Sequence, residues 1–314
     1  MKLKNRIISI ILGIATTVCL FGCTSSLNLD GVQRITPRGK AWSHVSGISW
    51  SPDGSELALA YTVGRVESVT DGYVYVIGME KGKPRILTLT KTSMGEVSGP
   101  AWSPTSNQIA FFVSGSEWDP GGIWLVHTDD TEAPVFLEVG LSCAWSPDGE
   151  QIAIAEARGD YQIYILNTYT GKKHQILQFS REGQYAVDSG ISWSPKGDKL
   201  AFSYGLASDK TASIYELDLV SGESRLLIEG GVHQFPSWSS DGTMVAFSGG
   251  PNVAEQTLVI IRTDDGSTIK PLDIVGVGPV AWSPDGNTIA FEWKGSAYTI
   301  DTAVALREWL SSEE

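Results

Sequence analysis

Short apolar runs alternate with polar turn segments along the chain from residue 45 to residue 301. Each unit of this pattern has a short run ending in Trp, a tight turn, an apolar run, a loop, an alternating run, a second turn and a polar outer run. In the first unit the four runs cover residues 45–50, 56–62, 72–77 and 84–90, and β-branched and aromatic residues dominate them. Such runs between turn residues are typical of β-strands. The pattern therefore predicts a four-stranded antiparallel meander in every unit.

A five-residue segment, Trp-Ser-Pro-Asp-Gly or a close copy, begins on the last residue of the first run of every unit. The copies begin at Trp50, Trp102, Trp145, Trp193, Trp238 and Trp282. Their spacing of 43 to 52 residues is typical of propeller repeats. The six copies predict an all-β fold, a six-bladed β-propeller of four-stranded antiparallel blades over residues 31–301.

The last unit lacks a clear fourth run. Its first three runs cover residues 279–282, 288–293 and 296–300, after which the pattern changes. Residues 31–37, near the N-terminus, match the outer runs of the other units. We expect this segment to complete the last blade and close the ring, which leaves no open sheet edge. The tail of residues 302–314 is expected to form a short helix or an extended cap.

The repeated segment has the chemistry of a tight turn. Pro52 presets φ, Asp53 suits the next position and Gly54 can adopt a positive φ. The second unit has Thr105 and Ser106 followed by Asn107 instead. We expect Asn107 to approach the left-handed region there, and this turn to be the least regular. The six tryptophans are expected to pack between blades rather than to bind a ligand.

The segment followed by a short apolar strand, as in residues 282–291, resembles the WD40-like repeat of TolB-type β-propellers. The resemblance covers residues 45–293 and implies the fold. TolB carries a further α/β domain before its propeller, whereas here about eight residues separate Cys23 from the first strand, so the function of the Tol system is not carried over. The repeat is also similar to the propeller of dipeptidyl-peptidase-like enzymes, which append an α/β-hydrolase domain, but the chain has no G-x-S-x-G motif.

The N-terminus has the features of an export signal. Three basic residues precede an uncharged stretch over residues 7–21. The sequence Leu-Phe-Gly-Cys at residues 20–23 resembles the bacterial lipobox, and this resemblance implies that Cys23 carries lipid. We expect a signal peptide at residues 1–22 and a lipidated tether at residues 23–30, anchoring the protein to the periplasmic or extracellular face of a bacterial membrane. An uncleaved transmembrane helix is the alternative, although the apolar stretch is shorter than the roughly 20 residues that a span needs.

Composition and charge exclude several classes of function. The chain has 314 residues, 42% of them apolar, and a formal net charge of −13, which suits a folded, acidic protein. Nucleic-acid binding is not expected, because it needs clustered basic residues. The four histidines, His44, His127, His174 and His233, show no metal-ligand spacing, so neither a metal nor a cofactor is expected. Cys143 lies in an apolar run and is expected to be a buried, inert thiol.

The loops that vary between units lie on the face opposite the repeated turns, where binding residues usually reside. Trp118 is the sharpest candidate, because it lies in a polar loop rich in Gly and Pro. Arg181, Tyr185, His233 and Phe235 are further candidates for the same rim. Each of these residues could instead only pack its own loop.

These features predict a non-catalytic module that binds or scaffolds a protein or peptide at the cell envelope. One alternative is an envelope hydrolase or lyase that acts on a glycan or peptide at the channel mouth, and a purely structural role is another. A cluster of carboxylates or histidines at the mouth would favour the enzyme. An apolar or aromatic rim would favour a protein or peptide partner.

Overall fold

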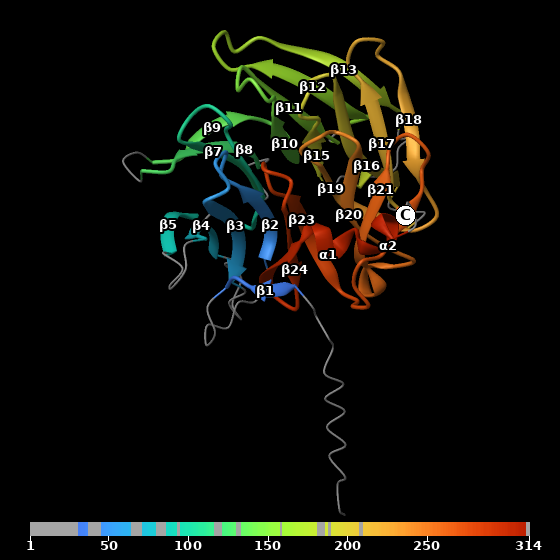
Figure 1. The fold of residues 1–314 in the computed structure, drawn as a ribbon. Helices are drawn as coiled ribbons and strands as arrows, with labels where there is room; N and C mark the ends of the chain where they lie inside the picture. Colours follow the sequence, from blue (N-terminus) through green and yellow to red (C-terminus); the bar gives the residue numbers. More distant parts are fainter. Residues whose placement is uncertain are drawn as a thin grey trace, which may run out of the picture.

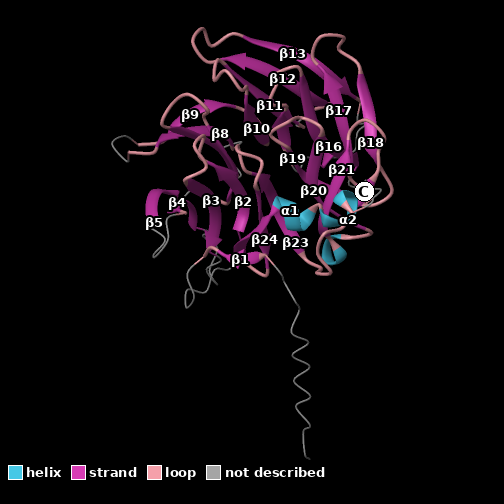
Figure 2. Ribbon diagram, viewed as in Figure 1, coloured by secondary structure: helices cyan, strands magenta, loops and turns pink. Residues whose placement is uncertain are grey.

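The fold is a ring of six antiparallel sheets around a central channel, as predicted from the repeats. The structure is a computed structural model, and it describes residues 31–36, 45–63, 71–79, 86–92, 95–115, 121–129, 133–157, 159–180, 186–187, 190–206 and 210–311. Figure 2 shows that strands make up nearly all of the regular structure. In the described part of the chain, no helix has the length and apolar character that crossing a membrane requires.

Each blade places its first strand beside the channel and its later strands progressively outward (Figure 1). Blade 1 consists of β2 (Val45–Trp50), β3 (Glu56–Val63), β4 (Asp71–Gly78) and β5 (Ile86–Thr92). Blade 2 consists of β6 (Val97–Trp102), β7 (Gln108–Val113), β8 (Gly122–His127) and β9 (Val135–Glu138). Blade 3 consists of β10 (Ser142–Trp145), β11 (Gln151–Glu156), β12 (Tyr161–Asn167) and β13 (Lys173–Phe179).

The remaining three blades follow the same order. Blade 4 consists of β15 (Ile191–Trp193), β16 (Lys199–Leu206), β17 (Ser213–Asp218) and β18 (Ser224–Ile228), and β14 (Ala186–Val187) also pairs with β16. Blade 5 consists of β19 (Val232–Trp238), β20 (Met244–Gly250), β21 (Thr257–Arg262) and β22 (Thr268–Ile269), with the 3-10 helix η1 (Val253–Glu255) after β20. Blade 6 consists of β23 (Val277–Trp282), β24 (Thr288–Trp293), β25 (Ser296–Asp301) and β1 (Val32–Arg34).

The ring closes through pairing of strands from opposite ends of the chain, as the sequence predicts. In blade 6, β1 pairs antiparallel with β25, with Val32 opposite Ile300 and Arg34 opposite Tyr298. Figure 1 shows this blue strand beside the red strands of the last blade. The Arg34 guanidinium also donates a 2.9 Å hydrogen bond to the Ser296 hydroxyl of β25. Blade 6 therefore has four strands, like blades 1 and 5 on either side of it.

The tail after β25 is helical rather than extended. Two short helices, α1 (Thr302–Ala305) and α2 (Arg307–Leu310), follow the last strand. The Asp301 carboxylate accepts a hydrogen bond from the backbone N–H of Ala303 and caps α1. Cζ of the Arg262 guanidinium lies 4.6 Å from the centre of the Trp309 ring, so the tail packs against blade 5.

Each repeated tryptophan packs in an apolar cluster that includes residues of the preceding blade, which confirms the predicted packing role. The Trp50 indole N–H donates a 3.1 Å hydrogen bond to the carbonyl of Ala281 in blade 6. The Trp145 indole N–H donates in the same way to Ala101 in blade 2, at 3.2 Å. Each of these indoles thus joins its own blade to the preceding one. Trp282 differs, because its N–H donates to Gly286 in its own turn.

The turn after the tryptophan is held by a serine and an aspartate. In blade 1 the Ser51 hydroxyl donates to the Asp53 carboxylate at 2.7 Å, and Gly54 has a φ of 70°. The backbone N–H of Ser55 donates to the same carboxylate, and these hydrogen bonds lower the pKa of Asp53 to about 2. In blades 3, 5 and 6 the equivalent serine also donates to the turn aspartate.

Blade 2 has the irregular turn, but the expectation for Asn107 is wrong. Among the described residues, the non-glycine residues with positive φ are Lys210, Phe235 and Lys294. This turn has no equivalent of the glycine and aspartate of the blade 1 turn, and its hydrogen-bond acceptor is the Ser103 hydroxyl instead of a carboxylate. It accepts hydrogen bonds from the Ser106 hydroxyl at 2.8 Å and from the Ser106 backbone N–H at 3.2 Å. This bonding closes the turn without a left-handed residue.

Candidate functional site

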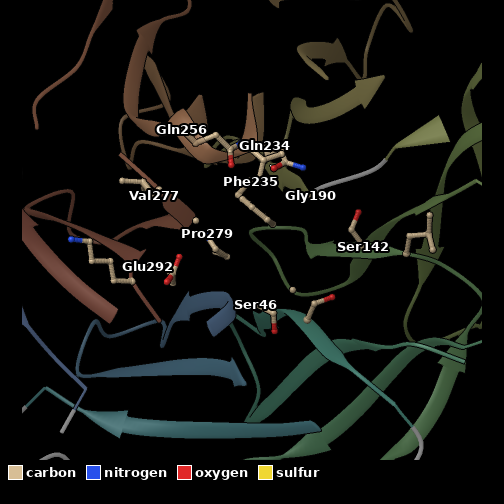
Figure 3. Close-up of a pocket in the computed structure, with 16 residues that line it drawn as sticks. Ser46, Ser142, Gly190, Gln234, Phe235, Gln256, Val277, Pro279 and Glu292 are labelled. Atoms are coloured by element: carbon tan, nitrogen blue, oxygen red, sulfur yellow. The ribbon is translucent and has the colours of Figure 1, made fainter. Parts of the chain in front are cut away.

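The two ends of the central channel differ in size and lining. At the end with the repeated turns, five of the six repeated tryptophans, all except Trp238, line a cavity of about 300 Å³. At the opposite end lies a larger cavity of about 530 Å³, lined by residues 46, 98–99, 141–142, 190, 234–235, 253, 256, 276–279, 292 and 294. We call it the channel-mouth cavity (Figure 3). Its volume lies within the range of about 300–1,000 Å³ that is usual for ligand sites.

Irregular starts of the innermost strands shape this cavity. The pairing register shifts between the first and second strands of blades 1, 2, 5 and 6, each time before the tryptophan. Such bulges redirect side chains at sheet ends. Small residues occupy several of the redirected positions, including Ser46, Ser98 and Gly99. The Ser46 hydroxyl donates to the Val97 carbonyl, which fixes blade 1 against blade 2 at the mouth.

Phe235 is directed into the cavity by the bulge in blade 5. The register of β19 against β20 shifts between Gln234 and Ser237, and Phe235 has a φ of 56°. A non-glycine residue in this region is strained by about 1–3 kcal/mol. Figure 3 shows the Phe235 side chain extending into the cavity, beside Gly190 of the neighbouring blade. A Cβ atom at Gly190 would lie 3.3 Å from the Phe235 Cα, so a glycine keeps this approach open.

Glu292 supplies a buried carboxylate to the wall of the cavity. It lies on β24, is only 5% exposed, and accepts a 2.5 Å hydrogen bond from the backbone N–H of Gly295. The backbone of Gly278 also hydrogen-bonds to the carboxylate. Burial raises the pKa of Glu292 to about 7, against an ordinary value of 4.5, because desolvation disfavours the charged form.

The remaining polar groups of the wall are mostly amides and hydroxyls. The Gln256 amide donates to the Gln234 side chain at 2.9 Å and to the Val232 carbonyl at 3.2 Å. The buried Ser142 hydroxyl has no hydrogen-bond partner within the described part of the chain. Lys294 is exposed, and its Nζ lies 4.5 Å from the centre of the Trp293 ring. Glu292 and Lys294 are the two ionisable side chains among the described lining residues.

A second, apolar hollow lies next to the channel-mouth cavity. It has a volume of about 570 Å³ and is lined by residues 210–212, 232, 234 and 252–254. Gln234 and Val253 border both cavities. The Val253 side chain is 64% exposed on η1. We call this second cavity the side hollow. Through it, the channel-mouth cavity continues over blade 5 as an apolar surface.

The structure places two of the five rim residues that the sequence singles out. Phe235 lines the channel-mouth cavity. His233 is 7% exposed and packs edge-to-face on Phe247, with 5.5 Å between ring centroids, and burial lowers its pKa. It thus lies behind the wall rather than in it. Trp118, Arg181 and Tyr185 lie outside the described residues, and so does Cys23.

Glu292 was missed by sequence reasoning, although the repeats contain a signal for it. It lies ten residues after the blade tryptophan, and the equivalent residues of blades 1 to 5 are Ala60, Phe112, Ala155, Ser203 and Ser248. A charged residue at an otherwise uncharged repeat position indicates a special role. Aligning the repeats by their tryptophans would have identified it.

The described residues offer no group of three or more His, Cys, Asp or Glu side chains arranged to hold a metal ion. Cys143 is a buried thiol on β10 that forms no disulfide with another described residue. Its sulfur packs in the apolar layer between blades 2 and 3, with Ile123 and Ile154 in the same cluster. The chemistry of the site therefore consists of apolar walls, amides, hydroxyls, the buried Glu292 carboxylate and the exposed Lys294 ammonium.

Comparison with known proteins places this geometry in context. No protein-family model matches the chain. A Bacillus subtilis protein named as the uncharacterized peptidase YuxL is 25% identical over 240 residues, which cover 73% of this chain and 31% of that protein. The chain thus spans about a third of the length of this relative.

Solved structures of two TolB proteins share the fold. A putative TolB from Agrobacterium tumefaciens superposes with a TM-score of 0.60 at 19% identity, covering 86% of this chain and 96% of that one. TolB from Acinetobacter baumannii superposes with a TM-score of 0.55 at 15% identity, covering 83% and 64%. Together with the six blades described above, these likenesses show that the chain has the six-bladed fold of the TolB-like β-propellers.

Proposed function

We propose that the protein is a recognition module of the bacterial cell envelope that binds a peptide segment of a partner protein in the channel-mouth cavity. The observation that carries this proposal is the lining of the cavity, where Phe235 extends from an apolar wall and the apolar side hollow continues from it. Sites of this kind bind extended apolar side chains through buried area and fix their orientation with a few polar groups.

The polar groups of the cavity suit a peptide backbone. Amide side chains at Gln234 and Gln256 and the Ser142 hydroxyl lie in a mainly apolar wall. Amides and hydroxyls both donate and accept, as the N–H and C=O groups of a peptide require. A rigid aromatic such as Phe235 is the type of residue that supplies much of the binding free energy at interfaces.

Export and lipid anchoring are part of the proposal. They rest on the basic N-terminus, the apolar stretch and Cys23 in the lipobox-like sequence. Replacing Cys23 with Ser should abolish labelling by a radioactive fatty acid and release the protein from membranes. Unchanged retention of Cys23→Ser in the membrane fraction would contradict lipid anchoring and favour an uncleaved helix.

Peptide recognition is tested by selecting binders from a displayed library of random heptapeptides on the wild-type protein. Selected peptides should bind Phe235→Ala about tenfold or more weakly, as expected for loss of an aromatic anchor. They should bind Val220→Ala as tightly as wild type, because Val220 is exposed in the hairpin between β17 and β18. Failure to enrich any peptide, or equal binding to both variants, would contradict the proposal.

A hydrolytic or lyase function is the second candidate, and Glu292 is the observation that favours it. A buried carboxyl with a pKa of about 7 is suited to donate or accept a proton near neutral pH. The match to a protein named as a peptidase supports the same candidate. Cleavage of a peptide or oligosaccharide library by wild type, lost in Glu292→Gln, would favour this function over recognition alone.

A further inference from the structure

Glu292 is a buried acid without a cationic partner among the described residues. The ion pairs between described residues join Lys173 to Glu138, and Lys199 and Arg225 to Glu216, and none of them includes Glu292. A buried carboxylate that lacks a counter-charge is costly. The fold nevertheless keeps this acid at the channel mouth, at a repeat position that carries no charge in the other five blades.

The ionisable groups near Glu292 do not neutralise it within the described structure. Lys294 follows it in the turn before β25, but its Nζ is 4.5 Å from the centre of the Trp293 ring and makes no ion pair with Glu292 among the described contacts. The facing strand β23 contributes only uncharged residues from Val277 to Trp282. A cation that reaches the carboxylate can therefore come through the cavity.

The carboxylate is positioned for such a cation. Glu292 lines the cavity, and Figure 3 shows it and Phe235 facing the same space from different blades. Between them the wall is formed by Val277 and Pro279. An alkyl stem can pack on these apolar groups while its charged end reaches the acid, as long basic side chains commonly do. The aromatic face of Phe235 also favours a nearby cation.

We propose that Glu292 is the counter-charge for a primary ammonium group of the peptide that binds in the channel-mouth cavity; this inference rests on the peptide recognition proposed above. A primary ammonium is a compact charge, and it can donate a hydrogen bond to a single free lone pair on a carboxylate oxygen. A guanidinium prefers both oxygens of a carboxylate side by side. Here the backbone N–H groups of Gly295 and Gly278 already hydrogen-bond to the carboxylate, which leaves less room for a bidentate fork.

The ammonium can come from a lysine side chain or from the N-terminus of the peptide. Two heptapeptide libraries distinguish these sources, one with acetylated N-termini and lysine present, the other with free N-termini and lysine omitted. The source that supplies the ammonium should be enriched on wild type and should lose its advantage on Glu292→Gln. Binders that are enriched equally on Glu292→Gln would overturn the assignment while leaving peptide recognition intact. An absence of binders in both libraries would instead contradict peptide recognition itself.

A small-molecule probe tests the ammonium site without a peptide. Titration of wild type with n-butylammonium, followed by NMR, should saturate at a concentration about tenfold lower than titration with n-butylguanidinium or 1-pentanol. Glu292→Gln should abolish this preference, and Val220→Ala should keep it. Equal saturation by the three probes on wild type, or an unchanged preference in Glu292→Gln, would overturn the proposal. Because Gln can still accept the Gly295 N–H, a purely structural role would not produce this change in preference.

Discussion

A Cβ atom on Gly278 would lie 2.3 Å from Oε2 of Glu292, so the glycine of β23 provides the space that the buried carboxylate of β24 occupies. The two residues belong to neighbouring strands of blade 6. Their relationship explains how a charged side chain is accommodated beside the innermost strand. It also gives a way to displace the carboxylate without mutating it.

Gly278→Ala should destabilise the protein by about 1–3 kcal/mol, because the new methyl group forces Glu292 out of its position. Urea unfolding would measure this change in the free energy of unfolding. Gly159→Ala is the matched control, since a Cβ atom there meets nothing within 4 Å. An equal loss in both variants would show that the space beside Glu292 is not the cause.

Glu292→Gln should make the stability of the protein less dependent on pH between 5 and 8. The pKa of Glu292 is about 7 in the folded protein and ordinarily 4.5, so the folded state binds this proton more tightly than the unfolded chain. The associated stability is complete below pH 4.5 and is lost as pH rises through 7. The loss between pH 5 and pH 8 is about 2–3 kcal/mol.

The comparison of wild type with Glu292→Gln isolates this group. Burial lowers the pKa of His233, which acts in the opposite direction and reduces stability as pH falls below its ordinary value of 6.5. The hydrogen-bonded Asp53 has a lowered pKa and acts only in more acidic solution. An equal change in the free energy of unfolding between pH 5 and pH 8 in the two proteins would contradict the assignment to Glu292.

Trp50→Phe should be more destabilising than Trp238→Phe, although the two tryptophans are similarly buried, at 8% and 6% exposure. The Trp50 indole N–H bonds to the Ala281 carbonyl, and its loss leaves that acceptor without this donor. The buried Trp238 N–H has no partner within the described residues, so nothing equivalent is lost there. We expect a difference of about 1–2 kcal/mol in thermal unfolding. The reverse order would argue against indole bonds between blades.

Phe235→Gly should be more stable than Phe235→Ala while binding selected peptides equally weakly. Both variants remove the ring, but only glycine adopts the φ of 56° without steric cost. The expected gap in the free energy of unfolding is about 1 kcal/mol or more. Chemical denaturation combined with a peptide titration would measure both effects, and an Ala variant as stable as the Gly variant would show that the backbone relaxes there.

The fold could be predicted because each blade repeats the same local chemistry. Pro, Asp and Gly specify the turn after Trp50 and its copies, and the missing outer run of the last unit indicated that residues 31–37 close the ring. The turn at Asn107 was mispredicted, because a serine hydroxyl closes it without a left-handed residue.

The site was less accessible to sequence reasoning, because residues distant in sequence form it together. Phe235 lines the channel-mouth cavity, but the direction of its side chain depends on a bulge that is defined only by pairing with β20. Glu292 lies in the second strand of its blade, outside the loops that vary between blades. Its importance comes from the channel in front of it and from Gly278 beside it.

The pairing of β1 with β25 imposes an order on folding. The Gln33 carbonyl accepts a hydrogen bond from the Thr299 hydroxyl, 266 residues further along the chain. During synthesis from the N-terminus, β1 emerges before the other strands of the propeller and its partner β25 emerges after them. The earlier blades can form one after another from local contacts, whereas contacts of such long sequence separation form slowly. Completion of blade 6 therefore requires that the strands of the other five blades have already been made.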